Sequence, residues 1–116
     1  MIDLGTHEIK SKYVNGPMYL TMGEYGDGSP ALIINTPSGE EVAIATVRLD
    51  VPPRAGYLWL KGWSENEGIP AALEDCGLVK LTGKTRPTGF VLALEAEFVP
   101  ATILKDALDG GTNVAD

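Results

Sequence analysis

The sequence predicts an α+β domain that has a curved antiparallel sheet of about five or six strands and one short helix. Short apolar runs recur along the 116-residue chain and are separated by turns of Gly, Pro and Asp, which is typical of antiparallel sheets. A single stretch, residues 67–76, favours helix instead. The length, with 44% hydrophobic and 22% charged residues, fits one globular domain, which we expect to span residues 1–100.

The expected strands lie where apolar and β-branched residues cluster between glycine and proline turns. The clearest pair flanks Pro37-Ser38-Gly39, and this spacing predicts a hairpin over residues 31–47. All the expected strands are 18–22, 31–36, 42–47, 57–63, 78–82 and 90–98. Residues 1–16 show little pattern, and residues 83–89 are predicted to form a basic loop.

Alternation along the later strands predicts which side chains face the core. Leu58 and Leu60 should be buried, whereas Tyr57, Trp59, Lys61 and Trp63 share the opposite, amphipathic face. In residues 90–98 the even-numbered positions are apolar and should face the core. The odd-numbered positions, with Glu95 and Glu97 among them, should face water.

Two signals compete for the start of the helix. Ser64 and Glu67 have the S-x-x-E spacing of a capping box, whereas Pro70 favours a start nearer Ile69 because proline is tolerated only in the first turn. Gly77 is a natural helix stop. We expect residues 101–116 to be a partly disordered tail, in which the amphipathic stretch 103–108 docks on the domain and the last residues fray.

No recognised catalytic, metal-binding or nucleotide-binding signature is present. His7 is the only histidine and lies in a weakly patterned region, so a histidine-based triad or metal site has no second member. Cys76 is the only cysteine, which excludes a disulfide within the chain and favours a reducing compartment. We therefore expect a protein that is not an enzyme and uses no metal and no cofactor.

The net charge of −7 argues against direct binding of nucleic acid, because a phosphate backbone repels such a chain. A basic protein surface, or a groove that normally holds nucleic acid, would attract it. Ordinary solubility is the alternative explanation of the charge. The sequence has no apolar run of about 18 residues and no basic-then-apolar leader, so we expect neither a membrane span nor a signal peptide.

The stretch 59–68 combines both tryptophans with short polar residues and two glycines, and it is the strongest candidate for a binding surface. Exposed Trp and Tyr side chains dominate the energetics of interfaces. We expect the anchors to be Tyr57, Trp59 and Trp63, and the polar, acidic rim to be Glu65, Asn66 and Glu67. The alternative is that the aromatic residues form a second core layer under the helix.

Residues 61–68 (KGWSENEG), then Ala72-Leu73, 76–79 (CGLV), Thr82-Gly83-Lys84 and 88–91 (TGFV), carry a resemblance. Over residues 17–98 the chain resembles a domain-of-unknown-function family of small proteins found on bacterial plasmids, integrative elements and phages. The resemblance implies a protein of the bacterial host cytoplasm. Small acidic proteins of mobile elements, among them anti-CRISPR proteins, often act by occluding a host protein.

The resemblance and the charge together predict an accessory protein that binds and inhibits a host protein. The expected target is a CRISPR-Cas or other antiviral defence complex, blocked by steric or charge-based occlusion. Two alternatives stay open at this point. One is a small-ligand-binding or hydrolytic protein with an aromatic pocket, and the other is a structural, homo-oligomeric phage component.

Overall fold

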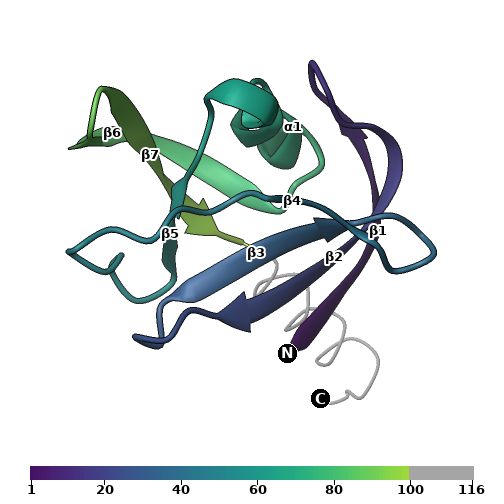
Figure 1. Cartoon of the computed structure of the whole chain (residues 1–116), viewed down its shortest axis with the longest axis horizontal. Helices are drawn as coiled ribbons and strands as arrows, with labels where there is room; N and C mark the ends of the chain where they lie inside the picture. Colours follow the sequence, from purple (N-terminus) through teal and green to yellow (C-terminus); the bar gives the residue numbers. More distant parts are fainter. Residues whose placement is uncertain (100–116) are drawn as a thin grey trace, which may run out of the picture.

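Residues 1–99 are described by a computed structural model, and they form two antiparallel sheets and one α-helix (Figure 1). The first sheet has the strand order β1 (Ile2–Lys10), β2 (Asn15–Glu24), β3 (Pro30–Asn35) and β4 (Glu41–Ile44). The second has the order β5 (Tyr57–Leu60), β7 (Val91–Phe98) and β6 (Val79–Thr88). A 3₁₀ turn, η1 (Ser64–Asn66), precedes the helix α1 (Ile69–Asp75).

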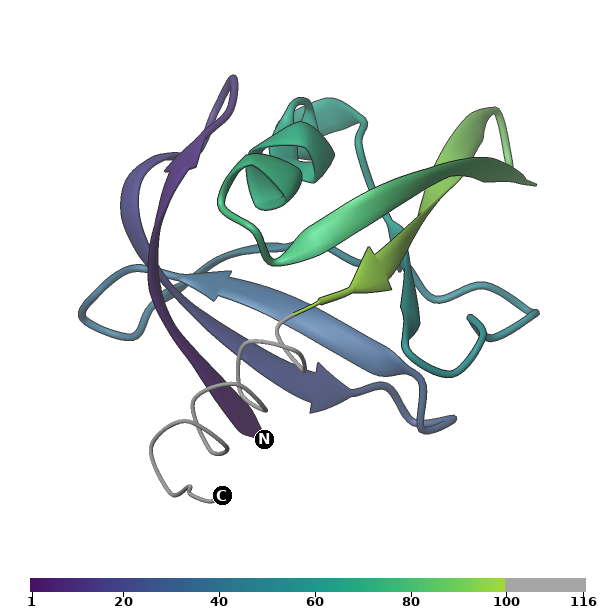
Figure 2. The same cartoon turned by 180° about the vertical axis from the view of Figure 1, so that it is seen from behind.

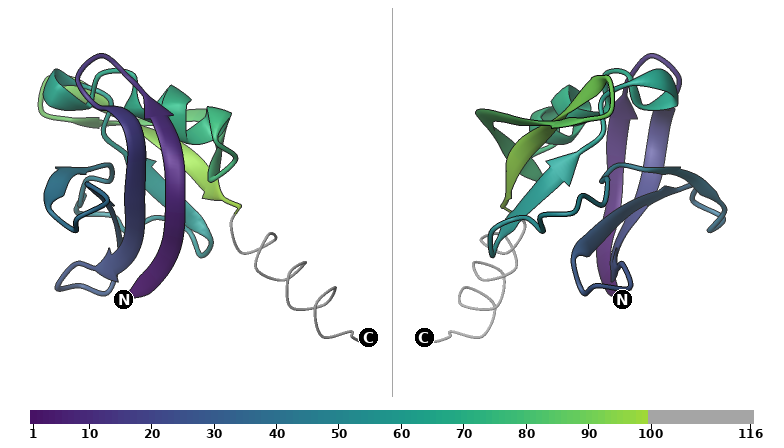
Figure 3. Two further views of the ribbon diagram at one scale, coloured as in Figure 1. Left: turned by 90° about the vertical axis from the view of Figure 1, so that its right-hand side faces the viewer. Right: turned by 60° about the vertical axis from the view of Figure 1, so that its left-hand side comes forward.

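The α+β class is confirmed, but the single curved sheet of five or six strands is wrong. Residues 42–47 and 57–63 were expected in one continuous sheet, and the chain instead divides its strands between two sheets that face each other at an angle (Figure 3). The predicted hairpin over 31–47 is confirmed, since β3 and β4 pair directly. The predicted tail, residues 101–116 with its stretch 103–108, lies outside the described residues.

Residues 45–47 join the two sheets. The backbone N–H of Ala45 donates to the carbonyl of Leu32 in β3 at 2.8 Å, and the carbonyl of Ala45 accepts from the N–H of Lys61 at 2.8 Å. The N–H of Val47 donates to the carbonyl of Trp59 at 3.0 Å. The chain therefore leaves the first sheet by pairing with the second, and the apolar faces of both sheets meet in one core.

The core lies between the sheets and is closed at one end by the helix (Figures 1 and 2). Helix α1 packs against both β1 and β6, which are the outer strands of their sheets. The largest fully buried apolar side chains come from both sheets and the helix: Ile9, Leu20, Leu32, Ile34, Leu58, Leu60, Ile69, Leu73 and Leu78. The predicted burial of Leu58 and Leu60 is thus confirmed.

The prediction for residues 1–16 missed strand β1. This strand lies at the edge of the first sheet, so most of its side chains are exposed or half-buried, and Ile9 is its one fully buried side chain. A register shift beside Gly5, whose φ is +78°, also interrupts the alternation. An edge strand of this kind carries too weak an apolar pattern to be recognised from its residues.

The predicted basic loop 83–89 is also wrong, because β6 continues through it to Thr88. A register shift between Leu81 and Thr85 places a bulge at Gly83, whose φ is +88°. The facing of β7 differs from the prediction as well. Its partner β5 pairs only with residues 94–97, so the hairpin beyond it leaves Phe90 and Leu92 exposed, whereas Ala93 and Glu95 are buried.

Local residues decide both ends of α1. The helix begins at Ile69 with Pro70 in its first turn, as Pro70 predicted, and the alternative capping box between Ser64 and Glu67 does not form. Gly77 ends the helix with φ +82°. Its N–H donates to the carbonyl of Glu74, and the N–H of Leu78 donates to the carbonyl of Leu73, both at 3.0 Å. This pair of bonds is a Schellman motif, which satisfies the last carbonyls.

Thr46 offers a test of the junction between the sheets. Its side chain is 3% exposed, and its Oγ1 accepts from the N–H of Leu32 at 3.1 Å and lies 3.1 Å from the hydroxyl of Tyr25. Thr46→Val keeps the shape but leaves a buried N–H without a partner, which costs about 1–3 kcal/mol. We expect a loss of that size in the free energy of unfolding, measured by urea denaturation. Thr85→Val, at an exposed strand position, should change it by less than about 0.5 kcal/mol, and equal effects of the two substitutions would contradict this role.

Candidate functional site

The three predicted anchors share one surface, which we call the aromatic strip and define as Tyr57, Trp59 and Trp63. Tyr57 and Trp59 lie in β5 and point away from the core, since Leu58 and Leu60 fill the other face. Trp63 follows just beyond the strand. All three side chains are half-buried, so they are neither a free aromatic face nor a closed core layer.

Two cations sit over rings of the aromatic strip. The guanidinium carbon of Arg54 lies 3.9 Å from the centre of the Tyr57 ring, and the Nζ of Lys61 lies 5.9 Å from that of Trp63. A cation within about 6 Å of a ring centre is attracted by the negative ring face. The strip is therefore an arrangement of aromatic rings with cations stacked over two of them.

Arg54 is held in place by a carboxylate under the strip. Its Nε and Nη2 donate to the two carboxylate oxygens of Glu95 at 3.2 and 3.1 Å, and the hydroxyl of Thr82 donates to Glu95 Oε1 at 2.8 Å. Glu95 lies opposite Trp59 in the β5–β7 pairing and is 4% exposed. The hydrogen bonds from Arg54, and then that from Thr82, hold the pKa of Glu95 below its ordinary value.

The sequence prediction missed Arg54, Thr82 and Glu95. Alternation in β7 assigned Glu95 to water, because a charged residue on the face opposite an apolar one is usually solvated. Its burial follows from a partner that is distant in sequence, Arg54, which arrives from the proline-rich loop before β5. The lone Arg after two prolines was the one local feature that marked this position.

The predicted rim separates into one buried and two exposed side chains. Asn66 is 1% exposed, and its Nδ2 donates to the carbonyl of Ile44 in β4 at 2.7 Å. Glu65 and Glu67 are exposed and form ion pairs with Lys61 at 3.2 Å and with Lys12 at 3.5 Å. A hydrogen bond from its own backbone, and then Lys61, lower the pKa of Glu65. The partner-binding role of these three residues stays a prediction, and of the three only Glu65 and Glu67 lie at the surface.

Residues 64–68, which we call the corner, are fastened to the first sheet at two points. The Asn66 side chain binds β4, and the carbonyl of Glu67 accepts from the backbone N–H of Lys12, in the β1–β2 turn, at 3.2 Å. Gly68 has φ +87°, and a Cβ there would lie 3.3 Å from the Cβ of Ser11. Only glycine fits this close approach without strain. The corner therefore fixes where Trp63 emerges from the structure.

One polar atom of the strip is left unsatisfied. The indole Nε1 of Trp59 is buried and has no hydrogen-bond partner among the described residues. A buried donor without a partner costs about 1–3 kcal/mol. The Trp59 indole is thus held by packing rather than by a hydrogen bond.

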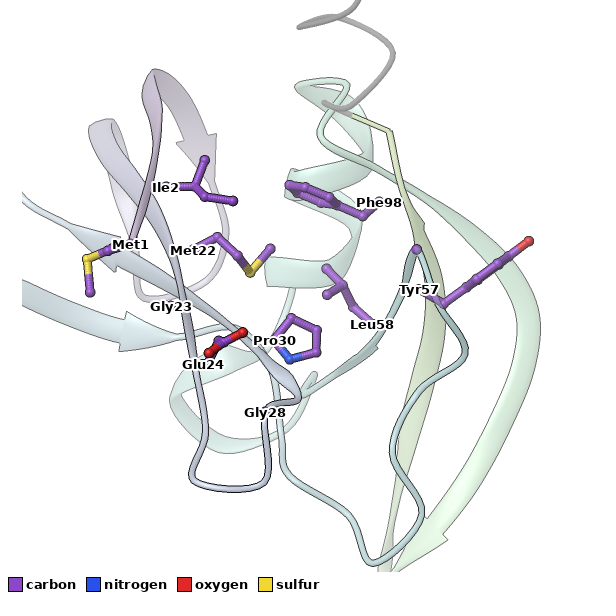
Figure 4. A pocket seen from close by; sticks show the side chains of 11 residues that line it. Met1, Ile2, Met22, Gly23, Glu24, Gly28, Pro30, Tyr57, Leu58 and Phe98 are labelled. Carbon is purple, nitrogen blue, oxygen red and sulfur yellow. The ribbon is translucent and has the colours of Figure 1, made fainter.

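An apolar cavity of roughly 650 Å³ opens between the two sheets on another side of β5. Ile2, Met22, Leu58 and Phe98 are among the side chains that line it (Figure 4). Neither tryptophan lines it. Tyr57 does line it, although Figure 4 shows its ring directed away from the hollow. The cavity and the aromatic strip therefore meet at Tyr57, and the two tryptophans lie outside this cavity.

Within residues 1–99 no cluster of three or more His, Cys, Asp or Glu side chains is placed to hold a metal ion. His7 lies in the edge strand β1, and its Nε2 is 2.7 Å from the carbonyl of Leu4, so the ring donates a hydrogen bond to its own strand. Burial, the largest influence, raises the pKa of the Cys76 thiol, which disfavours its nucleophilic thiolate form. No helix in the described part of the chain is long and apolar enough to span a membrane.

Comparison with known proteins finds no family model, no curated protein and no solved structure that matches the chain.

Asn66 tests whether the corner stabilises the fold. Asn66→Ala removes the donor to the Ile44 carbonyl and leaves a buried acceptor unsatisfied, so the free energy of unfolding should fall by about 1–3 kcal/mol. Glu67→Ala, the matched control, removes only an exposed ion pair and should cost less than about 1 kcal/mol. Urea denaturation measures both. An Asn66→Ala variant as stable as the wild type would show that the hydrogen bond from Asn66 to Ile44 does not stabilise the fold.

Glu95 should make the fold sensitive to acid. Its folded-state pKa is depressed, so its ionised form stabilises the fold at neutral pH, and this contribution is lost as the pH falls below about 5. Glu95→Gln should therefore lower stability at pH 7 and flatten the decline in unfolding free energy between pH 7 and pH 3. Glu97→Gln, at an exposed position of the same strand face, should keep the wild-type profile. Coincident profiles for Glu95→Gln and the wild type would refute the assignment.

Proposed function

We propose that this chain is a non-enzymatic binding protein that engages a partner protein through the aromatic strip and the acids beside it. The observation that supports the proposal is the pair of cations over Tyr57 and Trp63, two rings that remain half-exposed. Trp, Tyr and Arg are the residues that most often dominate the energetics of protein interfaces. Such residues gathered on the outer face of a sheet are what a binding surface requires.

The strip is ordered in advance. Glu95 holds Arg54 by two hydrogen bonds, Glu65 holds Lys61, and the corner fixes the position of Trp63. Ordering rotamer-rich side chains on binding costs about 0.5–1.5 kcal/mol each, and side chains that are already ordered avoid part of that cost. This favours recognition of one shaped partner surface over loose attraction.

The charge around the strip indicates a basic partner. Lys61 and Lys12 are each paired with a local carboxylate, and the whole chain carries a net charge of −7. Glu65 and Glu67 remain exposed at the Trp63 end of the strip. A basic surface would be attracted, and added salt should slow association because exposed charges are screened.

The resemblance to small proteins of plasmids and phages suggests where the partner would be found. In that setting the partner is a protein of the bacterial host, such as an antiviral defence complex. The chain inhibits it by occupying a basic surface that the complex needs. A basic groove that normally holds nucleic acid has the matching chemistry.

Alanine substitutions in the strip test the proposal. The tagged full chain is used to capture a partner from host lysate, and the affinity of the purified pair is then measured. Tyr57→Ala and Trp63→Ala should each weaken binding at least about tenfold, because a central aromatic anchor contributes more than about 1.4 kcal/mol. Glu65→Lys together with Glu67→Lys should abolish capture by reversing the charge of the rim.

Phe90→Ala is the matched control, since Phe90 is a fully exposed aromatic residue outside the strip, at the β6–β7 turn. It should leave the affinity unchanged. Undiminished capture by Trp63→Ala and by the double lysine variant would refute the named site. If the chain alone forms a defined oligomer in size exclusion that Trp63→Ala disrupts, the strip serves self-association instead.

A further inference from the structure

The apolar cavity between the sheets is not accounted for by the function proposed for the aromatic strip. Its wall is formed by Met22 and Leu58 from facing sheets, and by Phe98 at the end of β7 (Figure 4). Its volume of roughly 650 Å³ lies within the range of about 300–1,000 Å³ that is typical of sites for small organic groups. An apolar hollow of this size stabilises a protein only when something fills it, because its lining otherwise lacks contacts on one side.

Apolar side chains at the cavity are also left in water. Ile2 lines the cavity and is 53% exposed, and Met1 beside it is more exposed still. Clustered exposed apolar residues mark a surface that binds something. Glu24 is the one charged side chain that lines the cavity. An occupant should therefore present apolar groups to the hollow, with a positive group beside them.

The chain itself continues from this place. Phe98 lines the cavity, and the next residue, Val99, is fixed by a hydrogen bond of 3.0 Å from its N–H to the carbonyl of Leu78. Residues 100–116 therefore start at the cavity wall. Ten residues extend at most about 33–36 Å, so any side chain up to position 108 can reach the opening. A short tether also gives an effective concentration on the order of millimolar.

The sequence after Val99 has the matching chemistry. Its large apolar residues are Ile103, Leu104 and Leu108, and with Ala107 they recur at the i, i+1, i+4, i+5 spacing of one helical face. Lys105 is the only basic residue from position 100 onward. The segment thus offers an apolar face that matches the apolar wall. It also carries three aspartates, Asp106, Asp109 and Asp116, so only Lys105 can pair with the carboxylate of Glu24.

We propose that the cavity is the docking site of the chain's own segment 100–116, which places Leu104 and Leu108 against Met22, Leu58 and Phe98. Docking covers Ile2 and fills the hollow between the sheets. The occupant is thus part of the same molecule, and this proposal is independent of the function proposed for the aromatic strip.

The full-length chain with labelled methionine methyl groups tests the proposal by NMR. Met22 lines the cavity, whereas Met18 does not and provides an internal reference. Leu104→Asp/Leu108→Asp should expel the segment, shift the Met22 methyl signal and leave that of Met18 in place. Thr112→Asp/Asn113→Asp adds the same charge to the same segment outside the apolar face, and it should shift neither signal. A Met22 signal that is identical in the wild type and the leucine double variant overturns the proposal.

A second experiment distinguishes docking of the chain's own segment from binding of an external apolar ligand. It uses 1-anilinonaphthalene-8-sulfonate, a dye that fluoresces when it binds an apolar surface. The wild-type chain should bind it weakly, and Leu104→Asp/Leu108→Asp should bind it several-fold more strongly because the cavity opens. Equal and strong binding by both proteins would overturn the proposal and mark the cavity as an open site for an external apolar ligand. Neither result depends on capture of a partner by the strip, so the two proposals fail separately.

Discussion

The fold depends on the hydrogen bonds of residues 45–47. A strand has two hydrogen-bonding edges, and here one edge binds β3 through Leu32 while the other binds β5 through Trp59 and Lys61. Peptide geometry therefore sets how the two sheets approach each other. The side chain of Thr46 accepts a hydrogen bond from the N–H of Leu32, so this backbone donor stays satisfied where the chain passes from one sheet to the other. The core that the two sheets share follows from this crossing.

Strand β5 contributes to two surfaces because neighbouring side chains point in opposite directions. Leu58 faces inward and helps to line the cavity, whereas Trp59 faces outward in the aromatic strip. A single short strand, fixed by the crossing segment, thus positions both candidate sites. Their separation on opposite faces explains why neither tryptophan enters the cavity.

The corner contains both residues that tie it to the fold and residues that lie at the surface. Asn66 and the Glu67 backbone attach it to the first sheet, while Trp63 and Glu65 remain at the surface beside Lys61. The polar and aromatic residues look like one motif in the sequence. In the structure some of them hold the corner to the first sheet and the others lie at the surface. The tie holds the surface residues in a fixed position, which the proposed recognition of a shaped partner requires.

The sequence by itself determined the features that depend on near neighbours: the hairpin over 31–47, the inward face of Leu58 and Leu60, and the end of α1 at Gly77. Alternation and turn chemistry act over a few residues, so they can be recognised locally. Only the tertiary structure decided the division into two sheets, the edge strand β1, and the burial of Glu95 and Asn66. Glu95 is buried because Arg54, 41 residues away, reaches it, and Asn66 because it meets a carbonyl 22 residues away. Contacts of that range depend on where the whole chain has folded, which no local pattern encodes.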